Sequence, residues 1–259
     1  MEPLYFGEKS ELFGIYHSAI PAEEKNCGIV MCYPFGQEYI RCHRAYLKLA
    51  NELSDKGFHT LRFDYYGTGD SLGNSSETGM ERCYNDAINA INELKEGCKL
   101  DKIIVLGVRL GGIIAIKLSR FIDGLILWSP VLDGKTYTNS IKKIHKDWFG
   151  GSFAKQKKQY GEFESMGFSF SKSLSEEINS IELNNLKIPE NMPVLLIDES
   201  KNTQVQKFRR KYEQKGDLEF TESINKEFWM KQKSEAEKSM VPFQEINIIS
   251  EWLNKNTIN

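Results

Sequence analysis

Residues 107–111, Gly-Val-Arg-Leu-Gly, have the spacing of a sharp turn that could present one side chain for chemistry. The apolar, β-branched run Ile103–Leu106 before this turn is typical of a buried parallel strand. Apolar residues return at helical spacing from Leu110 to Leu118. A strand, a glycine-flanked turn and a helix together predict an elbow of the G-x-S-x-G type. Its central residue is Arg109, whose guanidinium keeps its protons at ordinary pH and therefore cannot act as a nucleophile.

Polar residues also follow two other predicted strands. Ser129 follows the buried run Leu125–Trp128, and Asp64 and Tyr65 open a glycine-rich loop after Phe58–Phe63. Ligands of parallel sheets bind beyond the carboxyl ends of the strands, so we expect Ser129 and Asp64 to lie near a pocket at the elbow. For Tyr65 two roles remain open, lining the pocket or packing beside it.

The periodicity of the chain predicts an α/β fold in a single domain, residues 1–259. Buried strands alternate with amphipathic helices, an order that gives a mostly parallel sheet covered by helices on both faces. The predicted strands are Leu12–His17 near the sheet edge, Gly28–Tyr33, Phe58–Phe63, Ile103–Leu106, Leu125–Trp128, Met192–Ile197 and Leu218–Thr221. The predicted helices are Arg44–Lys56, Glu81–Leu94, the helix after the elbow, and Ile246–Leu253.

Residues 136–189 interrupt this alternation with a polar stretch that contains two helical pieces, Ile141–Trp148 and Leu174–Ile181. An insertion at this position predicts a helical cap over the strand ends, and a solvated insertion is the alternative. The stretch is rich in lysine, which could attract an anionic partner or simply form a solvated helix face. The lysines concerned are Lys142, Lys143, Lys146, Lys155, Lys157 and Lys158.

Composition narrows the classes of protein and partner. The 34 Lys and Arg residues nearly balance the 36 Asp and Glu residues, which argues against nucleic acid or an anionic membrane as a partner. The five cysteines are an odd number without a Cys-x-x-Cys pair, which favours reduced thiols in a cytoplasmic protein. We find no signal-peptide pattern, no apolar run of ~20 residues and no metal-ligand spacing, so the sequence predicts neither a membrane span nor a metal or other cofactor.

Three longer motifs accompany the elbow. They are Tyr-Pro-Phe-Gly-Gln-Glu-Tyr-Ile-Arg at 33–41, Arg-Phe-Asp-Tyr-Tyr-Gly-Thr-Gly-Asp-Ser at 62–71, and Phe-Trp at 228–229. With these motifs the whole chain resembles the α/β-hydrolases, most of all the serine aminopeptidase S33 group. It is also similar to hydrolase-like proteins associated with the exosortase system. The resemblance implies an α/β-hydrolase fold and a relative of serine esterases, peptidases or thioesterases.

The resemblance also implies which residues replace the catalytic triad. The nucleophile position falls on Arg109, and the acid position falls on Asn202, with Asp198 and Glu199 close by. The histidine position falls on Glu227, and the chain has no histidine after His145. In this alignment, therefore, all three members of the Ser-His-Asp triad are absent.

A guanidinium and a carboxylate at neighbouring triad positions would form a charge-assisted ion pair. We therefore expect Arg109 to pair with Glu227, with Asn202 orienting the carboxylate. Two roles for Arg109 remain open: gripping a carboxylate, phosphate or amide of a ligand, or being locked to Glu227 or Glu38 and filling the site. The backbone N–H groups of Leu110 and of Phe35 or Gly36 would form an oxyanion-like site. Further pocket residues are expected to be Glu38, Asp64, Tyr65, Ser129 and Trp229.

Three classes of function follow. The first is a non-catalytic protein that binds an acyl, peptide-like or acidic ligand, or a protein partner. The second is an enzyme of non-standard mechanism, a hydrolase, acyl-transfer enzyme or lyase that uses Glu227, Arg109 and Asp64 on an ester, thioester or amide. The third is a serine hydrolase with a relocated triad. The residues to which the chemistry could have moved are Ser129 at a strand end, or Cys32 and Cys42 with His43 nearby.

Overall fold

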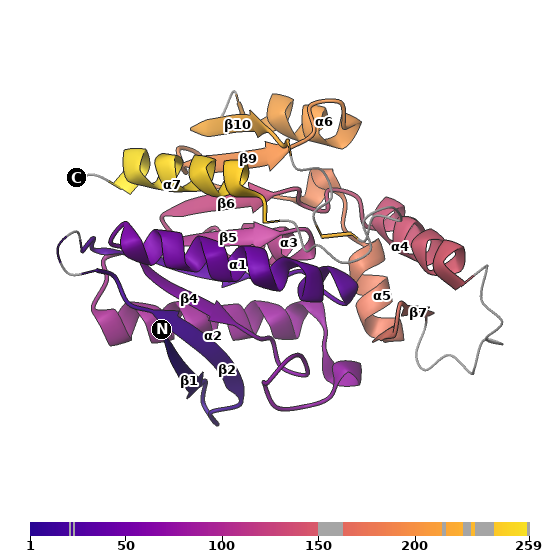
Figure 1. Ribbon diagram of the computed structural model, residues 1–259. Coiled ribbons are helices and arrows are strands. Elements are labelled where there is room, and N and C mark those ends of the chain that lie inside the picture. Colours follow the sequence, from indigo (N-terminus) through magenta and orange to yellow (C-terminus); the bar gives the residue numbers. More distant parts are fainter. Residues whose placement is uncertain are drawn as a thin grey trace.

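The computed structural model describes residues 1–20, 22, 24–149, 163–213, 216–224, 229–230 and 241–257. Strands and helices alternate along the chain (Figure 1), as predicted. The strands are β1 (Glu2–Phe6), β2 (Leu12–His17), β3 (Cys27–Cys32), β4 (His59–Phe63), β5 (Lys102–Val108), β6 (Gly124–Trp128), β7 (Phe163–Ser165), β8 (Phe168–Phe170), β9 (Val194–Asp198) and β10 (Leu218–Glu222). The helices are α1 (Gln37–Asp55), α2 (Met80–Cys98), α3 (Leu110–Lys117), α4 (Gly134–Phe149), α5 (Lys172–Asn179), α6 (Thr203–Tyr212) and α7 (Phe243–Thr257), with short 3-10 turns η2 (Ser75–Glu77) and η3 (Leu183–Asn185).

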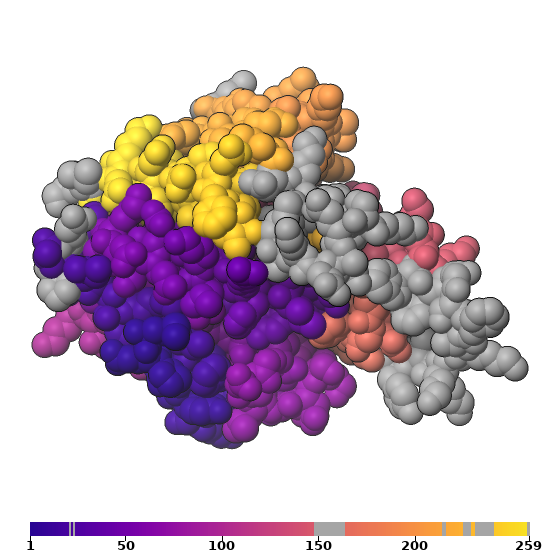
Figure 2. All heavy atoms as spheres, viewed as in Figure 1, coloured from indigo at the N-terminus to yellow at the C-terminus, as the bar shows by residue number. Residues whose placement is uncertain are grey.

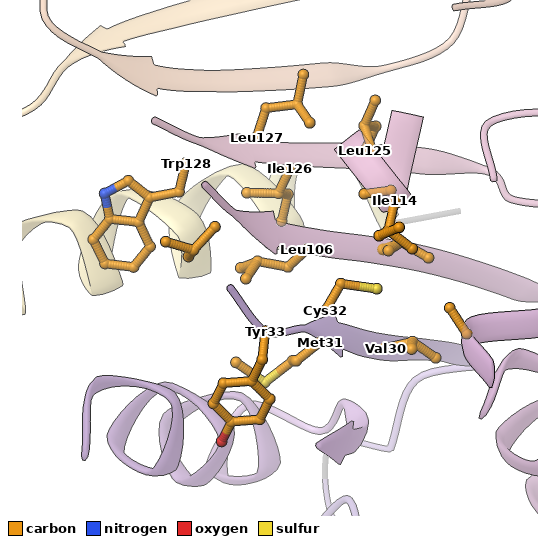
Figure 3. Close-up of a cluster of buried hydrophobic side chains, with 14 of the residues drawn as sticks. Val30, Met31, Cys32, Tyr33, Leu106, Ile114, Leu125, Ile126, Leu127 and Trp128 are labelled. Carbon is orange, nitrogen blue, oxygen red and sulfur yellow. The ribbon is translucent and has the colours of Figure 1, made fainter. Parts of the chain in front are cut away.

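Within the described residues, one eight-stranded sheet has the order β1-β2-β4-β3-β5-β6-β9-β10. β1 and β2 pair in antiparallel fashion and β2 runs antiparallel to β4, while every pairing from β4 to β10 is parallel. The central strands are buried along their whole length because helices cover both faces, which explains their continuous apolar sequences. Figure 3 shows side chains of β3, β5 and β6 packed together in this core. The predicted α/β fold is therefore confirmed.

Helices α1 and α7 contact each other and cover one face of the sheet, while α2 and α3 contact each other and cover the opposite face (Figure 1). Figure 2 shows α1 and α7 side by side on the molecular surface. The buried residues of α1 recur at helical spacing, from Cys42 through Tyr46 and Leu49 to Leu53, so one stripe of the helix meets the sheet. The chain leaves α1 through Gly57, whose φ of 85° suits the left-handed end of a helix.

The predicted start of helix α1 is wrong, and the prediction lacks strand β1 and helix α6. Helix α1 begins at Gln37 rather than Arg44, because Cys42 is a buried apolar residue that extends the stripe toward the N-terminus. The edge strand β1 was not predicted, and Leu12–His17 lies next to it, near the sheet edge as expected. Helix α6 was also left out, since its sequence is mostly polar and only Val205, Phe208 and Tyr212 are buried.

The chain between β6 and β9 contains α4, the hairpin β7-β8, α5 and η3. The two predicted helical pieces correspond to α4 and α5, and α4 begins earlier than expected. In Figure 1, α4 lies beyond the carboxyl ends of the parallel strands. The Glu177 carboxylate on α5 accepts a hydrogen bond from the Met80 N–H at the start of α2, 2.5 Å away. This carboxylate therefore joins the segment to the body of the molecule through a helix N-terminus. None of the helices in the described part is long and apolar enough to cross a membrane.

Glycines allow the elbow between β5 and α3 to pack closely. A Cβ at Gly111 would lie 2.2 Å from the Cys32 carbonyl oxygen, and a Cβ at Gly107 would lie 2.3 Å from the Gly111 carbonyl oxygen. These contacts are with backbone atoms that cannot move aside without shifting a strand. The glycines at these two positions are therefore required by close packing against β3 and within the turn.

We predict that Gly111→Ala lowers the free energy of unfolding by more than about 2 kcal/mol, because the added methyl overlaps the β3 backbone. Gly97→Ala is the matched control: Gly97 is exposed on α2 and its Cβ would meet no atom within 4 Å. That change should leave stability unchanged or raise it by up to about 1 kcal/mol. Urea unfolding of both variants measures the difference, and equal effects would contradict the packing argument.

Candidate functional site

Strand register brings three residues from distant parts of the sequence to one edge of the sheet. Val108 pairs with Trp128, and Trp128 pairs with Ile197. The next residues along these strands are Arg109, Ser129 and Asp198. The Arg109 N–H donates to the Trp128 carbonyl (3.1 Å) and the Ser129 N–H donates to the Ile197 carbonyl (2.8 Å). The three residues therefore form a row at the carboxyl ends of β5, β6 and β9, where α/β sheets bind ligands.

Arg109 has φ 54° and ψ −120° between the end of β5 and the start of α3. Ser129, beside it in the row, has φ 46°. Non-glycine residues in this region of backbone conformation are strained, and such strain is found most often at functional sites. The strand–turn–helix elbow predicted at 107–111 is therefore present, with Arg109 between β5 and α3.

The guanidinium of Arg109 is bound by a carboxylate from the first turn of α1. Arg109 Nε donates to Glu38 Oε1 at 3.0 Å, and Nη1 donates to the Ser129 carbonyl at 3.1 Å. The Tyr137 hydroxyl of α4 donates to the other oxygen, Glu38 Oε2, at 3.0 Å. The side chains of Arg109 and Glu38 are only 20% and 8% exposed, so this is a largely desolvated ion pair. It connects the elbow, α1 and α4.

Aromatic rings enclose the same guanidinium. The Arg109 Cζ atom lies 4.9 Å from the centre of the Trp229 ring and 5.5 Å from that of Tyr137. Burial lowers the pKa of Arg109, but the Glu38 carboxylate raises it, and the net shift is upward. The guanidinium therefore stays protonated and cannot serve as a base.

A cavity of about 200 Å³ opens beside Arg109. Polar groups dominate its walls, and the Trp229 ring is its main apolar surface. The lining residues are Arg109, Ser129, Asp198, Glu199, Asn202, Ser223 and Trp229. A separate apolar cavity of about 90 Å³ lies on the other side of Glu38 and Trp229, next to α4, with Phe35, Tyr137, Ile141 and Phe170 among its lining residues. The site thus combines a polar chamber with a smaller apolar one.

Asp198 is the buried one of the two carboxyl residues that line the polar cavity, and only 6% of it is exposed. Burial raises its pKa to about 6, although the Glu199 N–H, which donates to Oδ1 at 2.7 Å, and the nearby Arg109 both favour the charged form. A carboxyl group that titrates near pH 6 can exchange a proton under physiological conditions.

The structure brings together some of the residues predicted from the sequence. Glu38 binds Arg109, Ser129 and Asn202 line the polar cavity, and Trp229 lies over the guanidinium. The Asn202 side chain caps α6 by accepting from the Gln204 N–H at 3.0 Å, so its carbonyl oxygen has a structural role. Leu110 opens α3, Gly36 precedes α1 with φ 61°, and Phe35 lines the apolar cavity. Their oxyanion-like role stays a prediction.

Other predicted residues lie elsewhere. Asp64 accepts hydrogen bonds from the Tyr39 hydroxyl and the Asp70 N–H and so holds the glycine-rich loop together. Tyr65 is 1% exposed and packs edge-on against Phe35 and Phe63. Neither is among the lining residues of the cavity beside Arg109, because strand β4 ends two strands away from β5. Asp64 therefore lies outside that cavity, and of the two roles left open for Tyr65 the structure shows packing. Glu227 lies outside the described residues, and the expected pair with Arg109 therefore stays a prediction.

All four histidines of the chain are described, and each is engaged away from Arg109. His17 accepts from Arg62 at 3.1 Å, and His43 stacks on Tyr33. His59 contacts Tyr16 and Glu24, and His145 accepts from the Met166 N–H.

Cys32 and Cys42 are fully buried, and burial raises the pKa of both thiols. These contacts give no support to a relocated nucleophile and histidine base. Within the described part, no group of His, Cys, Asp and Glu residues could hold a metal ion.

Sequence reasoning missed two important residues. Asp198 entered only as a neighbour of Asn202, yet it is the buried carboxyl group of the cavity. Its signal was available, because an acid that directly follows a buried apolar strand lies at the ligand edge of a parallel sheet. Tyr137 had no such signal, since only the folding of α4 onto the sheet brings its hydroxyl to Glu38.

We predict that Arg109→Met and Glu38→Gln each destabilise the protein. Arg109→Met should lower the free energy of unfolding by about 3–5 kcal/mol, because it leaves the Glu38 carboxylate buried without its cation. The double variant should be less destabilised than the sum of the single changes by about 1–3 kcal/mol. Denaturant unfolding of all four proteins measures this coupling energy. Additive effects would contradict a structural ion pair.

Asp198 gives a pH-dependent prediction. Its pKa in the folded protein, about 6, lies above the ordinary value of ~3.9, so protonation favours the folded state. Its contribution to stability is complete at low pH and is lost as the pH rises through 6. Relative to Asp198→Asn, the wild type should therefore lose about 2–3 kcal/mol of unfolding free energy between pH 4 and pH 7. A constant difference across this range would show that Asp198 is not perturbed by burial.

Known proteins of similar fold and sequence agree with this architecture. An esterase from Pyrococcus furiosus superimposes with a TM-score of 0.66, at 18% sequence identity, over 99% of this chain and 91% of that one. The structure of DcsB in complex with its substrate analogue superimposes with a TM-score of 0.65, at 14% identity, over 95% and 94% of the two chains. At these identities the similarity establishes the α/β-hydrolase fold.

In sequence, the lysophosphatidylserine lipase ABHD12 of Xenopus tropicalis is 33% identical over 108 residues, which are 39% of this chain and 27% of the relative. The match thus spans about a quarter of that relative's length. The family model of the serine aminopeptidase S33 proteins matches residues 39–206, more than half of the chain, including the elbow, the row of strand ends and α4. This protein therefore belongs to the serine aminopeptidase S33 family of the α/β-hydrolase superfamily.

Proposed function

We propose that this protein is a non-catalytic member of its family that binds an acyl, peptide-like or acidic ligand, or a protein partner, at the cavity beside Arg109. The observation that carries the proposal is the state of the elbow. Where the family motif has a serine, the elbow holds a buried guanidinium that is bound to Glu38 and to the Ser129 carbonyl. A guanidinium at this position binds anions and carbonyl oxygens but cannot attack them.

The absence of an imidazole at the site supports the same conclusion. Acyl transfer by a serine needs a base within hydrogen-bond distance of the hydroxyl. Each of the four histidines has another partner in the fold, and none follows His145 in the sequence. Ser129, the hydroxyl in the row of strand ends, therefore has no histidine base.

We also propose that the segment 136–189 acts as a cap over the site. The support comes from α4, whose Tyr137 hydroxyl reaches Glu38 and whose Ile141 lines the apolar cavity. The cap would shield Arg109 from water and strengthen its interaction with a ligand anion.

A cytoplasmic location remains our prediction, supported by five free cysteines. The similarity to exosortase-associated proteins likewise stays a prediction.

One observation favours a second candidate function, an enzyme of non-standard mechanism acting on an ester, thioester or amide. The pKa of Asp198 is raised to about 6 in a cavity that also contains a fixed guanidinium. A carboxyl group of this pKa could act as a general acid or base while Arg109 stabilised a developing oxyanion. This mechanism would use Asp198, with Glu227 as the alternative base predicted from the sequence.

We expect the wild-type protein to resist labelling by a fluorophosphonate probe and to leave p-nitrophenyl esters intact. The reason is that neither Ser129 nor Ser223, the two serines that line the cavity, has a histidine base. Arg109→Ser should also remain unlabelled, since the serine it introduces lacks an imidazole partner. Gel fluorescence and absorbance at the nitrophenolate band provide the two readouts.

A catalytically active S33 hydrolase of known triad serves as the positive control. Labelling of the wild type would overturn the binding proposal. Ester turnover without labelling, lost in Asp198→Asn or Glu227→Gln, would instead support the second candidate.

A further inference from the structure

Three charged side chains line the cavity beside Arg109, namely Arg109, Asp198 and Glu199, and the hydrogen-bonding capacity of Arg109 and Asp198 is partly unused. Arg109 Nε and Nη1 have acceptors, but no described residue accepts a hydrogen bond from Nη2. Asp198 Oδ1 accepts from the Glu199 N–H, but no described residue donates to Oδ2. Both side chains line the same cavity of about 200 Å³. Unused hydrogen-bonding capacity on both sides of one cavity leaves room for a ligand that contacts both groups.

The spacing of the two charges follows from the sheet. Arg109 follows β5, Asp198 ends β9, and β6 lies between these strands. Two strand spacings place their backbones about 10 Å apart. The two side chains extend into the cavity between them and shorten the gap. A ligand that reaches both groups must therefore be small and must carry a charged group at each end.

We propose that this cavity binds a small amino carboxylate, with the ligand carboxylate on Arg109 and the ligand ammonium on Asp198. This proposal rests on the proposed binding function and specifies the class of its ligand. The carboxylate accepts from Nη2 of Arg109, with the Ser129 hydroxyl beside it. The ammonium donates to Oδ2 of Asp198. The Arg109 guanidinium and the Asp198 carboxylate then each meet an opposite charge of the ligand.

Other ligand classes match the cavity less well. A phosphate or a dicarboxylate would pair with Arg109 but would bring a second negative charge toward Asp198. A neutral acyl chain would leave both charged groups without new partners, which is costly in a site this buried. Only a molecule with both charges satisfies both walls. The backbone strain at Arg109 and Ser129 is consistent with a site held in position for binding.

The test uses isothermal titration calorimetry on the wild-type chain with glycine, β-alanine and γ-aminobutyrate. These probes share the same charged ends and differ in the distance between them. Each is compared with its N-acetyl derivative, which lacks the ammonium, and with its amide, which lacks the carboxylate. We expect at least one probe to bind at least about tenfold more tightly than both of its derivatives.

The pH dependence separates the two ends of the ligand. The charged groups that face Asp198 are Arg109 at the elbow, Glu199 after β9 and Glu222 on β10. An ammonium favours the ionised form of Asp198, so affinity for the amino carboxylate should rise as the pH increases through 6. Ionised Asp198 repels a carboxylate, so the affinity for the N-acetyl derivative should fall over the same range.

Asp198→Asn keeps the shape of the side chain and removes its charge. This variant should bind the amino carboxylate at least about tenfold more weakly and lose the rise of affinity with pH. Asp217→Asn, which changes an exposed carboxylate before β10, is the matched control and should bind like the wild type. The comparison of probes on the wild type decides the question even if Asp198→Asn does not fold.

The proposal is overturned if the N-acetyl derivatives bind as tightly as the parent probes. It is equally overturned if none of the three probes binds at concentrations up to about 10 mM. Either result leaves the non-catalytic binding function standing, because that function fails on a different readout, labelling by the fluorophosphonate probe.

Discussion

The ion pair between Arg109 and Glu38 is the interaction on which the candidate site depends. It joins the turn after the central strand to the first turn of α1, and through Tyr137 it extends to α4. Both side chains are largely removed from water, so each charge would be costly without the other. This network therefore holds the elbow, the first turn of α1 and helix α4 together.

The strained backbone at Arg109 and Ser129 is maintained by the sheet beneath it. β5, β6 and β9 pair in parallel, and Val108, Trp128 and Ile197 are in register at their carboxyl ends. Close packing of Gly111 against β3 leaves no room for a wider turn. In a serine hydrolase, the same geometry would present a hydroxyl to a substrate carbonyl. Here the elbow carries the guanidinium of Arg109 in place of a hydroxyl.

The electrostatics of the cavity follow from the same arrangement. Arg109 is held protonated by Glu38, and burial brings the pKa of Asp198 to about 6. A fixed positive charge and a titratable carboxyl group thus face one chamber, and a smaller apolar chamber lies beside it. In the proposed binding function, such a site would discriminate among ligands by charge and by the distance between charged groups.

The amino-acid sequence by itself determined the alternation of strands and helices, the elbow at 107–111, and the replacement of the serine by Arg109, because these depend on local periodicity and residue type. It also placed Glu38 and Ser129 near the site. Only the tertiary structure showed that Arg109 binds Glu38, that Asp64 and Tyr65 belong to the loop and core, and that Asp198 lines the cavity. One physical reason is that helix α1 begins seven residues earlier than its pattern indicated. The other is that strand register and the docking of α4 are set by packing between segments far apart in the chain.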